Sequence, residues 1–401
     1  MRFDSYNYGC NSSLLTGIPK MTETETRTDQ PPFLHDSYLA WCEEQPVPMI
    51  EGFGMDLAKL NTEKWDLYGM NGAICLLKGR DDYNSIFCFE LTPGSKSREL
   101  HHLYEEIVYV IDGYGSTQIE TPDGSKHSFE WGRNSLFSVP LNAKYQHFNG
   151  SGTEPARLAS VHNFPFLIKL FRNEDFIFNT ERDFFERLGP NGYFKGEGQM
   201  IEIRPGRHQW ETNFVSDITN FELKDWAARG KGSSSLRWVL SDSTMGCHTS
   251  QIVPGTYKKA HRHTCGTNVF TIDGEGYSML WYEGKEDERV RIDWDHGVVV
   301  TPPEQMFHQH FNTGTTPSRY LAVQFGTVRY PMISAKMKKW TSGNDTSVKD
   351  GGNQIEYEDQ PADNHAIWLE EMDEKGHRSE MGEIFEEDHI RASNYGRSAP
   401  K

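Results

Sequence analysis

The chain has 401 residues, enough for two or three domains of ordinary size, and its 12% aromatic content is far from that of a disordered protein. Its formal net charge of -17 would repel a phosphate backbone or an anionic membrane surface, so we expect neither nucleic acid nor membrane as a partner. No run of about 18 apolar residues is present, which predicts that no segment spans a membrane.

The N-terminus and the cysteines indicate a cytoplasmic protein. The six cysteines form no CxxC pair and no regular framework, which is typical of reduced thiols in the cytosol. The first residues lack the basic start and long apolar core of a signal peptide. Translation could begin at Met1 or at Met21, and residues 1–30 are expected to form a flexible tail.

Short strands dominate the middle of the chain. They are rich in β-branched and aromatic residues and are bounded by Gly, Pro and Asp. Those of a first block lie at 72–79, 84–94, 105–121 and 134–140, and those of a second at 236–242, 250–255, 268–284, 296–303 and 318–326. The similar spacing of the two blocks indicates an internal duplication.

The segments outside these blocks complete the predicted domain organisation. The predicted parts are a tail (1–30), an N-terminal arm (31–66), a first β domain (67–168), a helical linker (169–235), a second β domain (236–330) and an acidic C-terminal extension (331–401).

Within the linker, one helix is predicted with Phe184, Phe185 and Leu188 on one face, and a second from Lys224 to Arg229, ended by Gly230.

The C-terminal extension carries 15 acidic and 6 basic residues over 341–401. We expect a solvated acidic tail that packs partly on the second domain. The alternative is one amphipathic helix in which Ile367, Trp368 and Met372 anchor the chain.

A possible metal site lies in the second block, in the stretch "AHRHTCGTNVFTIDGEG" (260–276). Alternate residues of a strand point the same way, so His261 and His263 share one face. A later stretch, "GVVVTPPEQMFHQHFN", carries His308, which a returning hairpin would bring to the same point. Three imidazoles can hold one divalent metal, so the pattern predicts a metal site.

These spacings resemble the two cupin motifs, G-x5-H-x-H-x3-4-E-x6-G and G-x5-P-x-G-x2-H-x3-N, and both motifs occur once in each block. The chain therefore resembles a bicupin over about residues 70–330. The resemblance implies an all-β fold of two tandem cupin double-stranded β-helix (jelly-roll) barrels, joined by the helical linker and followed by the acidic tail. It also implies a homo-oligomer, in which the arm 31–66 could be exchanged.

The two blocks depart from the motifs differently. In the second, His261, His263 and His308 fall on ligand positions, but Asn268 or Thr267 stands where the glutamate belongs.

In the first block, Leu100 and Tyr145 replace two of the histidines, whereas His102 and Glu106 remain. A rearranged metal site could form there from His101, His102, Glu106 and His147. The alternative is a degenerate barrel whose buried polar groups hydrogen-bond to one another.

The second block also resembles the ring-cleaving bicupin dioxygenases that act on gentisate, salicylate and 1-hydroxy-2-naphthoate. It shares with them the HxH spacing, the closing glycine, a triad without glutamate and the ending "FHQHFN". By this resemblance His261, His263 and His308 would hold Fe(II), with Mn, Cu, Ni or Zn as other candidates, and His310 would orient a ligand or the substrate. In that family the well-formed metal barrel is usually the N-terminal one, whereas here it is the C-terminal one.

The resemblance therefore implies an Fe(II) dioxygenase that uses O2 to cleave a C–C bond in a hydroxylated aromatic acid or a similar chelating anion. Two alternatives stay open. One is a metal-dependent lyase, decarboxylase or isomerase that uses the ion as a Lewis acid. The other is a non-catalytic bicupin that binds a small molecule.

Overall fold

The structure, a computed structural model, describes residues 36–80, 83–263, 266–330 and 344–385. The predicted tail 1–30, the choice between Met1 and Met21, and Cys265 lie outside the described residues. Within the described ranges, no helix is both long and apolar enough to cross a membrane.

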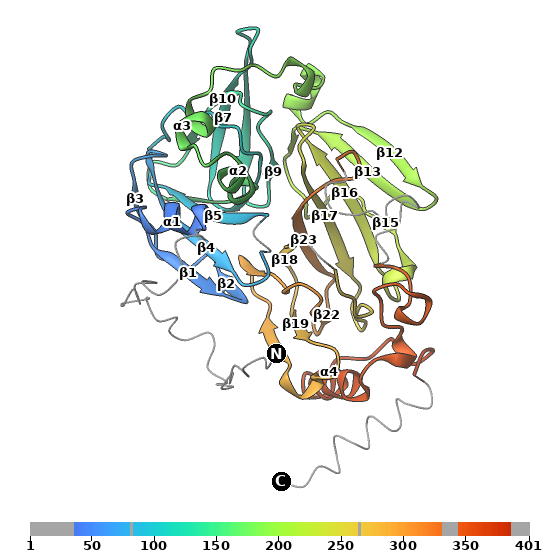
Figure 1. The fold of residues 1–401 in the computed structure, drawn as a ribbon. Coiled ribbons are helices and arrows are strands. Elements are labelled where there is room, and N and C mark those ends of the chain that lie inside the picture. The colour runs from blue at the N-terminus through green and yellow to red at the C-terminus, as the bar shows by residue number, and fades with distance from the viewer. Residues whose placement is uncertain (1–35, 81–82, 264–265, 331–343, 386–401) are drawn as a thin grey trace. The chain divides into compact units, whose positions relative to one another are not determined.

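The protein is mostly β, and sixteen of its strands form two repeats of eight (Figure 1). The first repeat contains β4 (Met70–Leu77), β5 (Ser85–Leu91), β6 (Glu106–Asp112), β7 (Tyr114–Glu120), β8 (Lys126–Gly132), β9 (Leu136–Phe137), β10 (Lys144–Asn149) and β11 (Ala156–His162). The second contains β16 (Ser234–Leu240), β17 (Met245–Ile252), β18 (Asn268–Asp273), β19 (Gly276–Trp281), β20 (Val290–Asp293), β21 (Val298–Val300), β22 (Phe307–Asn312) and β23 (Ser318–Phe325).

Both repeats pair their strands in the same order, which confirms the predicted duplication. The larger sheets run β4-β5-β11-β6-β9 and β16-β17-β23-β18-β21, and the smaller sheets run β10-β7-β8 and β22-β19-β20. In each repeat one further segment joins the small sheet through isolated bridges, at Leu100 to Tyr145 and at His261 to His308. Each repeat thus contributes five strands to a large sheet and three to a small one.

A single apolar cluster contains residues from both large sheets, among them Cys75 and Ile107 of the first and Trp238 and Leu321 of the second. Leu236, Trp238 and Leu240 all belong to this cluster. Because side chains alternate along a strand, Arg237 of β16 faces the opposite way, toward the inside of the second repeat.

The N-terminal segment joins the sheets of both repeats. After helix α1 (Ser37–Glu43), strand β1 (Met49–Gly52) pairs with β4 of the first repeat. Strand β2 (Gly54–Asp56) pairs with β21 of the second, and β3 (Glu63–Trp65) pairs with β4. The described part of the arm is therefore paired within its own chain.

The segment 169–235, expected to be a helical linker, consists largely of strands and short turns. Its helices are the end of α2 (Phe164–Phe171) and α3 (Glu174–Asn179), and its 3-10 turns are Phe185–Arg187, Asn191–Lys195 and Ala227–Arg229. Its strands are β12 (Gln199–Arg204), β13 (Arg207–Thr212), β14 (Phe214–Val215) and β15 (Lys224–Asp225).

Neither of the two α-helices predicted in this segment is present in it. Gly189 and Pro190 end the first pattern after a single turn, which is too short for a stable helix. The second begins as strand β15, because its residues pair with β16. Pairing also explains β12 and β13, since β13 adds a strand to the edge of the second large sheet. Here partner strands override the local helix preference.

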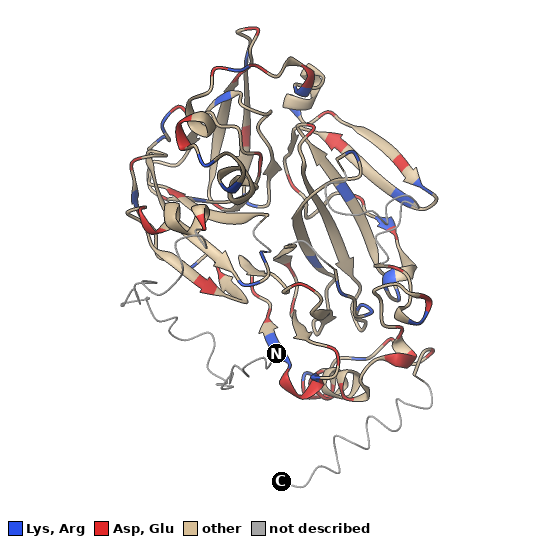
Figure 2. Ribbon diagram, in the orientation of Figure 1, with Lys and Arg blue, Asp and Glu red and all other residues tan. Residues whose placement is uncertain are grey.

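The C-terminal extension contains an amphipathic helix, as the alternative prediction had it. It holds a 3-10 turn at Val348–Asp350, another at Tyr357–Asp359 and helix α4 (Ala362–Glu374). Trp368 and Met372 are buried in an apolar cluster with Tyr257 and Phe311 of the second repeat, whereas Ile367 is only partly buried. Acidic positions appear in red along α4 in Figure 2, and Asp363, Glu370, Asp373 and Glu374 are exposed. A further 3-10 turn, Glu286–Glu288, precedes β20.

Candidate metal centre

His261 and His308 are cross-strand partners. The backbone N–H of His261 donates to the carbonyl of His308 at 3.1 Å, and the N–H of His308 donates back at 2.9 Å. Directly paired residues of antiparallel strands place their side chains on the same face, and the two ring centroids lie 4.1 Å apart. The pairing therefore forces these two imidazoles together.

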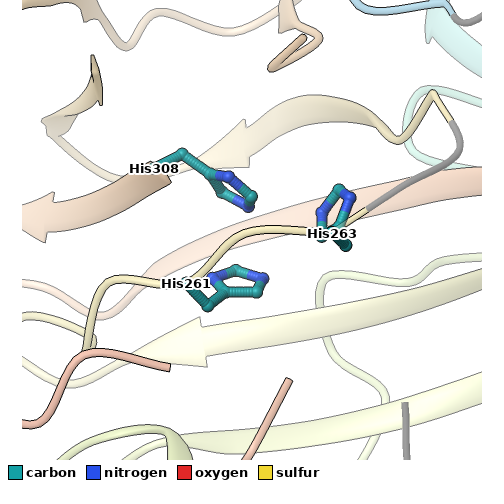
Figure 3. A group of neighbouring side chains, drawn as sticks. All are labelled: His261, His263 and His308. Carbon is teal, nitrogen blue, oxygen red and sulfur yellow. The ribbon is translucent and has the colours of Figure 1, made fainter. Parts of the chain in front are cut away.

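His263 completes the group from two residues further along the chain. Its ring centroid lies 5.3 Å from that of His261 and 4.7 Å from that of His308 (Figure 3). One ring nitrogen from each histidine lies within 4.8 Å of the others. Nitrogens about 2.1 Å from a shared metal are at most roughly 4.2 Å apart, so a small rotation of the rings closes the group around an ion.

The chemical state of the rings suits a metal ligand. Burial, and then the charges of Arg229 and the other histidines, lower the pKa of His261 well below its usual value. Burial and the neighbouring histidines do the same for His308, which is 1% exposed. Both rings are therefore neutral near neutral pH, and neutral imidazole is the form that ligates a metal.

The hydrogen bonds of the two rings differ. Nδ1 of His308 lies 3.3 Å from the carbonyl oxygen of Met306, so this nitrogen carries the proton and Nε2 keeps its lone pair. Nδ1 of His261 contacts the guanidinium of Arg229, which can only donate. The neutral His261 ring therefore carries its proton on Nε2, and metal binding at that atom would require the proton to move to Nδ1, where Arg229 now donates.

Arg229 is a site residue that the sequence analysis missed. It is 2% exposed, and it also donates to the carbonyl of Asn344 and to Oε1 of Gln354, each at 2.7 Å. Gln354 in turn forms a backbone bridge with His261. The C-terminal extension thus holds Arg229 against the triad. These contacts span 115 and 125 residues of sequence, and no local pattern signals them.

The position of the missing glutamate supplies no ligand. The amide of Asn268 donates to Oδ1 of Asn84 at 2.8 Å and accepts from Thr301 at 2.7 Å, so it is committed to a contact with the first repeat. The hydroxyl of Thr267 lies 3.3 Å from Oε1 of Gln324. Among the described residues, the triad is the one group of His, Cys, Asp and Glu side chains placed to hold an ion.

His310 lies beside the triad but outside it, with its ring centroid 5.6 Å from that of His308. Its Nδ1 lies 2.8 Å from the hydroxyl of Ser278, which also accepts from the indole of Trp294 at 2.8 Å.

The first repeat contains the same arrangement. Nδ1 of His147 lies 2.8 Å from the hydroxyl of Thr117, which accepts from the indole of Trp131 at 2.9 Å. This three-residue network therefore forms with or without a neighbouring histidine triad.

The remaining polar residues of the first repeat are occupied with one another. The hydroxyl of Tyr145 donates to Oε1 of Glu106 at 2.6 Å and lies 2.8 Å from Nε2 of His102. Burial raises the pKa of Glu106, but contacts with His102, Ser160 and Tyr145 outweigh it and bring the pKa to about 2.

His101 is partly exposed and takes no part in this network. Of the two alternatives, the structure favours a degenerate site over a rearranged metal site of His101, His102, Glu106 and His147. The hydroxyl of Tyr145 bridges His102 and Glu106, the two residues that remain at ligand positions.

Comparison with known proteins gave no match to a family model and no match to a curated protein. The chain has a low similarity to solved structures of oxalate decarboxylase from Bacillus subtilis. A deletion variant is 15% identical, with 69% of this chain and 78% of that chain covered and a TM-score of 0.44. A structure described for its Mn(II) centres is 14% identical, with the same coverage and TM-score.

Proposed function

We propose that the chain is a bicupin whose second repeat binds one divalent metal through His261, His263 and His308. We further propose that it is an Fe(II) dioxygenase acting on a hydroxylated aromatic acid or a similar chelating anion. The observation that carries this proposal is the convergence of three histidines, with no carboxylate among the ligand-bearing side chains that the structure describes.

The ligand set favours this class of chemistry. Three neutral imidazoles leave a divalent ion with its full charge and about three positions for other ligands. When bound, Fe(II) would supply Lewis acidity and the electrons that couple a chelating substrate to O2, so that a C–C bond is opened. Mn, Cu, Ni and Zn suit the same donors and remain alternatives.

The protein's own residues would bind and orient the substrate. The Arg229 guanidinium places positive charge beside the triad, which attracts an anion. The Ser278 contact fixes the ring of His310, whose Nε2 can then hydrogen-bond to a substrate oxygen.

A second candidate is a metal-dependent lyase, decarboxylase or isomerase, and Lys258 favours it. This side chain is 1% exposed, and its Nζ contacts the hydroxyl of Tyr320 at 3.1 Å. Burial, and then Arg229 and Arg207, lower its pKa well below the usual value. A lysine of this kind can exchange a proton with a substrate, which is chemistry that needs no O2.

Oxygen consumption separates these functions. Protein loaded with Fe(II) under anaerobic conditions would be mixed with gentisate, salicylate or 1-hydroxy-2-naphthoate, and O2 uptake measured beside His308→Ala and, as a control, His101→Ala. Uptake that His308→Ala abolishes and His101→Ala retains supports the dioxygenase. Turnover without O2 would favour the lyase class. Binding of one of these acids without turnover, both with and without O2, would favour a non-catalytic protein that binds a small molecule.

A further inference from the structure

Four basic side chains gather inside the second repeat. Arg207 lies on β13, Arg237 on β16, Lys258 on the segment that leads to the triad and Arg229 in the turn Ala227–Arg229. Arg207, Arg229 and Lys258 are buried, and Arg237 points inward from its strand. Lysine and arginine positions appear in blue along these strands in Figure 2.

None of the four makes an ion pair with a carboxylate in the described ranges. Arg229 donates only to neutral acceptors, Lys258 contacts a tyrosine hydroxyl, and Arg207 lies over the ring of Trp226, 3.4 Å from its centroid. The charge of Asp345 acts on Arg207, Arg229 and Arg237, but this carboxylate is paired with Arg204 at 2.6 Å.

These cations act on one another. Burial, followed by Arg237 and Arg204, lowers the pKa of Arg207 to about 8. His248, the cross-strand partner of Arg237, has its pKa lowered by burial and then by Arg237, Lys258, Arg207 and Arg229. A buried excess of positive charge is unfavourable in itself, so an anion that enters this region gains energy by balancing it.

At the corresponding positions of its first two strands, the first repeat has apolar residues. There the inward cross-strand pair is Ile74 and Phe87, both fully buried in an apolar cluster. In the second repeat the corresponding pair is Arg237 and His248, and both retain accessible surface. The replacement of a packed apolar pair by an arginine and a neutral histidine, both partly accessible, is specific to the repeat that carries the triad.

The cluster also lies next to the triad. Arg229 contacts His261 directly, and the backbone N–H of Lys258 donates to the carbonyl of His310 at 3.0 Å. The ring of Tyr320, which Lys258 contacts, lies 4.9 Å from that of His310. The cluster and the triad are therefore direct neighbours in the second repeat.

We propose that Arg207, Arg237 and Lys258 form an anion subsite, so that the second repeat takes a small dianion with one acidic group at the triad and the other on this cluster. The assignment of the first acidic group to the triad rests on the proposed function, whereas the subsite itself does not. A second carboxylate and a phosphate share the required chemistry, namely a compact group with oxygen acceptors and negative charge.

The test uses metal-free, full-length protein, so that it is independent of catalysis. Calorimetric titration and thermal unfolding would be measured with succinate, inorganic phosphate and acetate, at constant ionic strength set with KCl. We expect succinate or phosphate to bind and to raise the unfolding temperature more than acetate does, and the stronger of the two identifies the source of the charge.

Variants complete the test. Lys258→Met and Arg237→Met should each weaken binding by about tenfold or more, and should unfold at the same or a higher temperature than the parent without anion, because each removes unbalanced buried charge. Lys64→Met, an exposed lysine paired with Asp66, is the control and should behave like the parent.

Undiminished anion binding in both inner variants, or no binding to the parent, overturns the subsite. A lower unfolding temperature without anion in both variants would instead make the cations structural and also overturn it. Anion binding that survives while metal and O2 uptake fail would overturn the proposed function and leave the subsite standing.

Discussion

The guanidinium of Arg229 donates a hydrogen bond to Nδ1 of His261. This contact fixes the position of the proton on a ligand of the candidate metal centre, since the neutral ring must then carry hydrogen on Nε2. It also places a buried cation beside the ion that the triad would bind. Arg229 therefore opposes the metal electrostatically, although it links the triad to the C-terminal extension.

Replacement of Arg229 should strengthen metal binding. In Arg229→Met the proton of His261 can move to Nδ1 and the neighbouring charge is gone, so we expect roughly tenfold tighter binding of Mn2+ at pH 7. Affinity would be measured by calorimetric titration. The control is Arg204→Met, which removes another contact to the extension, the Asp345 pair, without touching the triad. Weaker binding in Arg229→Met than in the control would mean that Arg229 serves to position His261.

The C-terminal extension should contribute to the stability of the second repeat. Trp368 is fully buried, and its indole donates to the carbonyl of Asn312 at 2.8 Å. We expect Trp368→Ala to lower the free energy of unfolding by about 3–5 kcal/mol. Ile367→Ala, a change at the adjacent partly buried residue, should cost roughly 1 kcal/mol. Urea denaturation measures both, and equal, negligible effects would mean that the extension is a solvated tail.

Acid should destabilise the first repeat through its buried histidines. Burial lowers the pKa of His162 to about 3 and that of His147 to about 4. The unfolded chain therefore binds more protons than the folded one below pH 6.5. The free energy of unfolding should fall as the pH drops from about 6.5 toward these values, by about 1.4 kcal/mol per pH unit for each histidine.

Substitution of His162 isolates its contribution to this pH dependence of the free energy of unfolding. His162 lies against the ring of Phe87, with a centroid distance of 3.9 Å, and neither of its ring nitrogens has a hydrogen-bond partner among the described residues. His162→Leu should therefore be more stable at pH 5 and should show a shallower pH dependence in urea denaturation. Parallel stability curves for the variant and the parent would contradict the assignment.

The Tyr145 hydroxyl should hold the degenerate site together. Its removal leaves Glu106 and His102 each without one hydrogen bond, so Tyr145→Phe should destabilise the protein by about 1–3 kcal/mol. Metal content should not change, because the triad lies in the other repeat. Tyr114→Phe, a change at an exposed tyrosine, provides the control for urea denaturation. A variant as stable as this control would mean that the network contributes little.

Sequence reasoning predicted the triad because its geometry is local. His261 and His263 are two residues apart, and one strand pairing brings in His308. The duplicated β pattern was equally visible, since strand composition and turn residues recur at similar spacing.

What sequence reasoning missed depends on distant contacts. Arg229 precedes the second repeat in the sequence and Gln354 follows it, yet both contact His261. Arg237 is recognisable as an inward residue only once its neighbours in the strand are known to pack on the first repeat. Strands β12 and β13 form through pairing rather than through a strong alternating pattern, so the linker was predicted as helical.

Metal content per chain tests the central claim most directly. It would be measured by mass spectrometry on protein prepared under iron-replete, anaerobic conditions, together with His308→Ala and the control His101→Ala. The account predicts about one metal ion per chain in the parent and in His101→Ala, and near zero in His308→Ala. Metal retained in His308→Ala, or none in any of the three proteins, would contradict it.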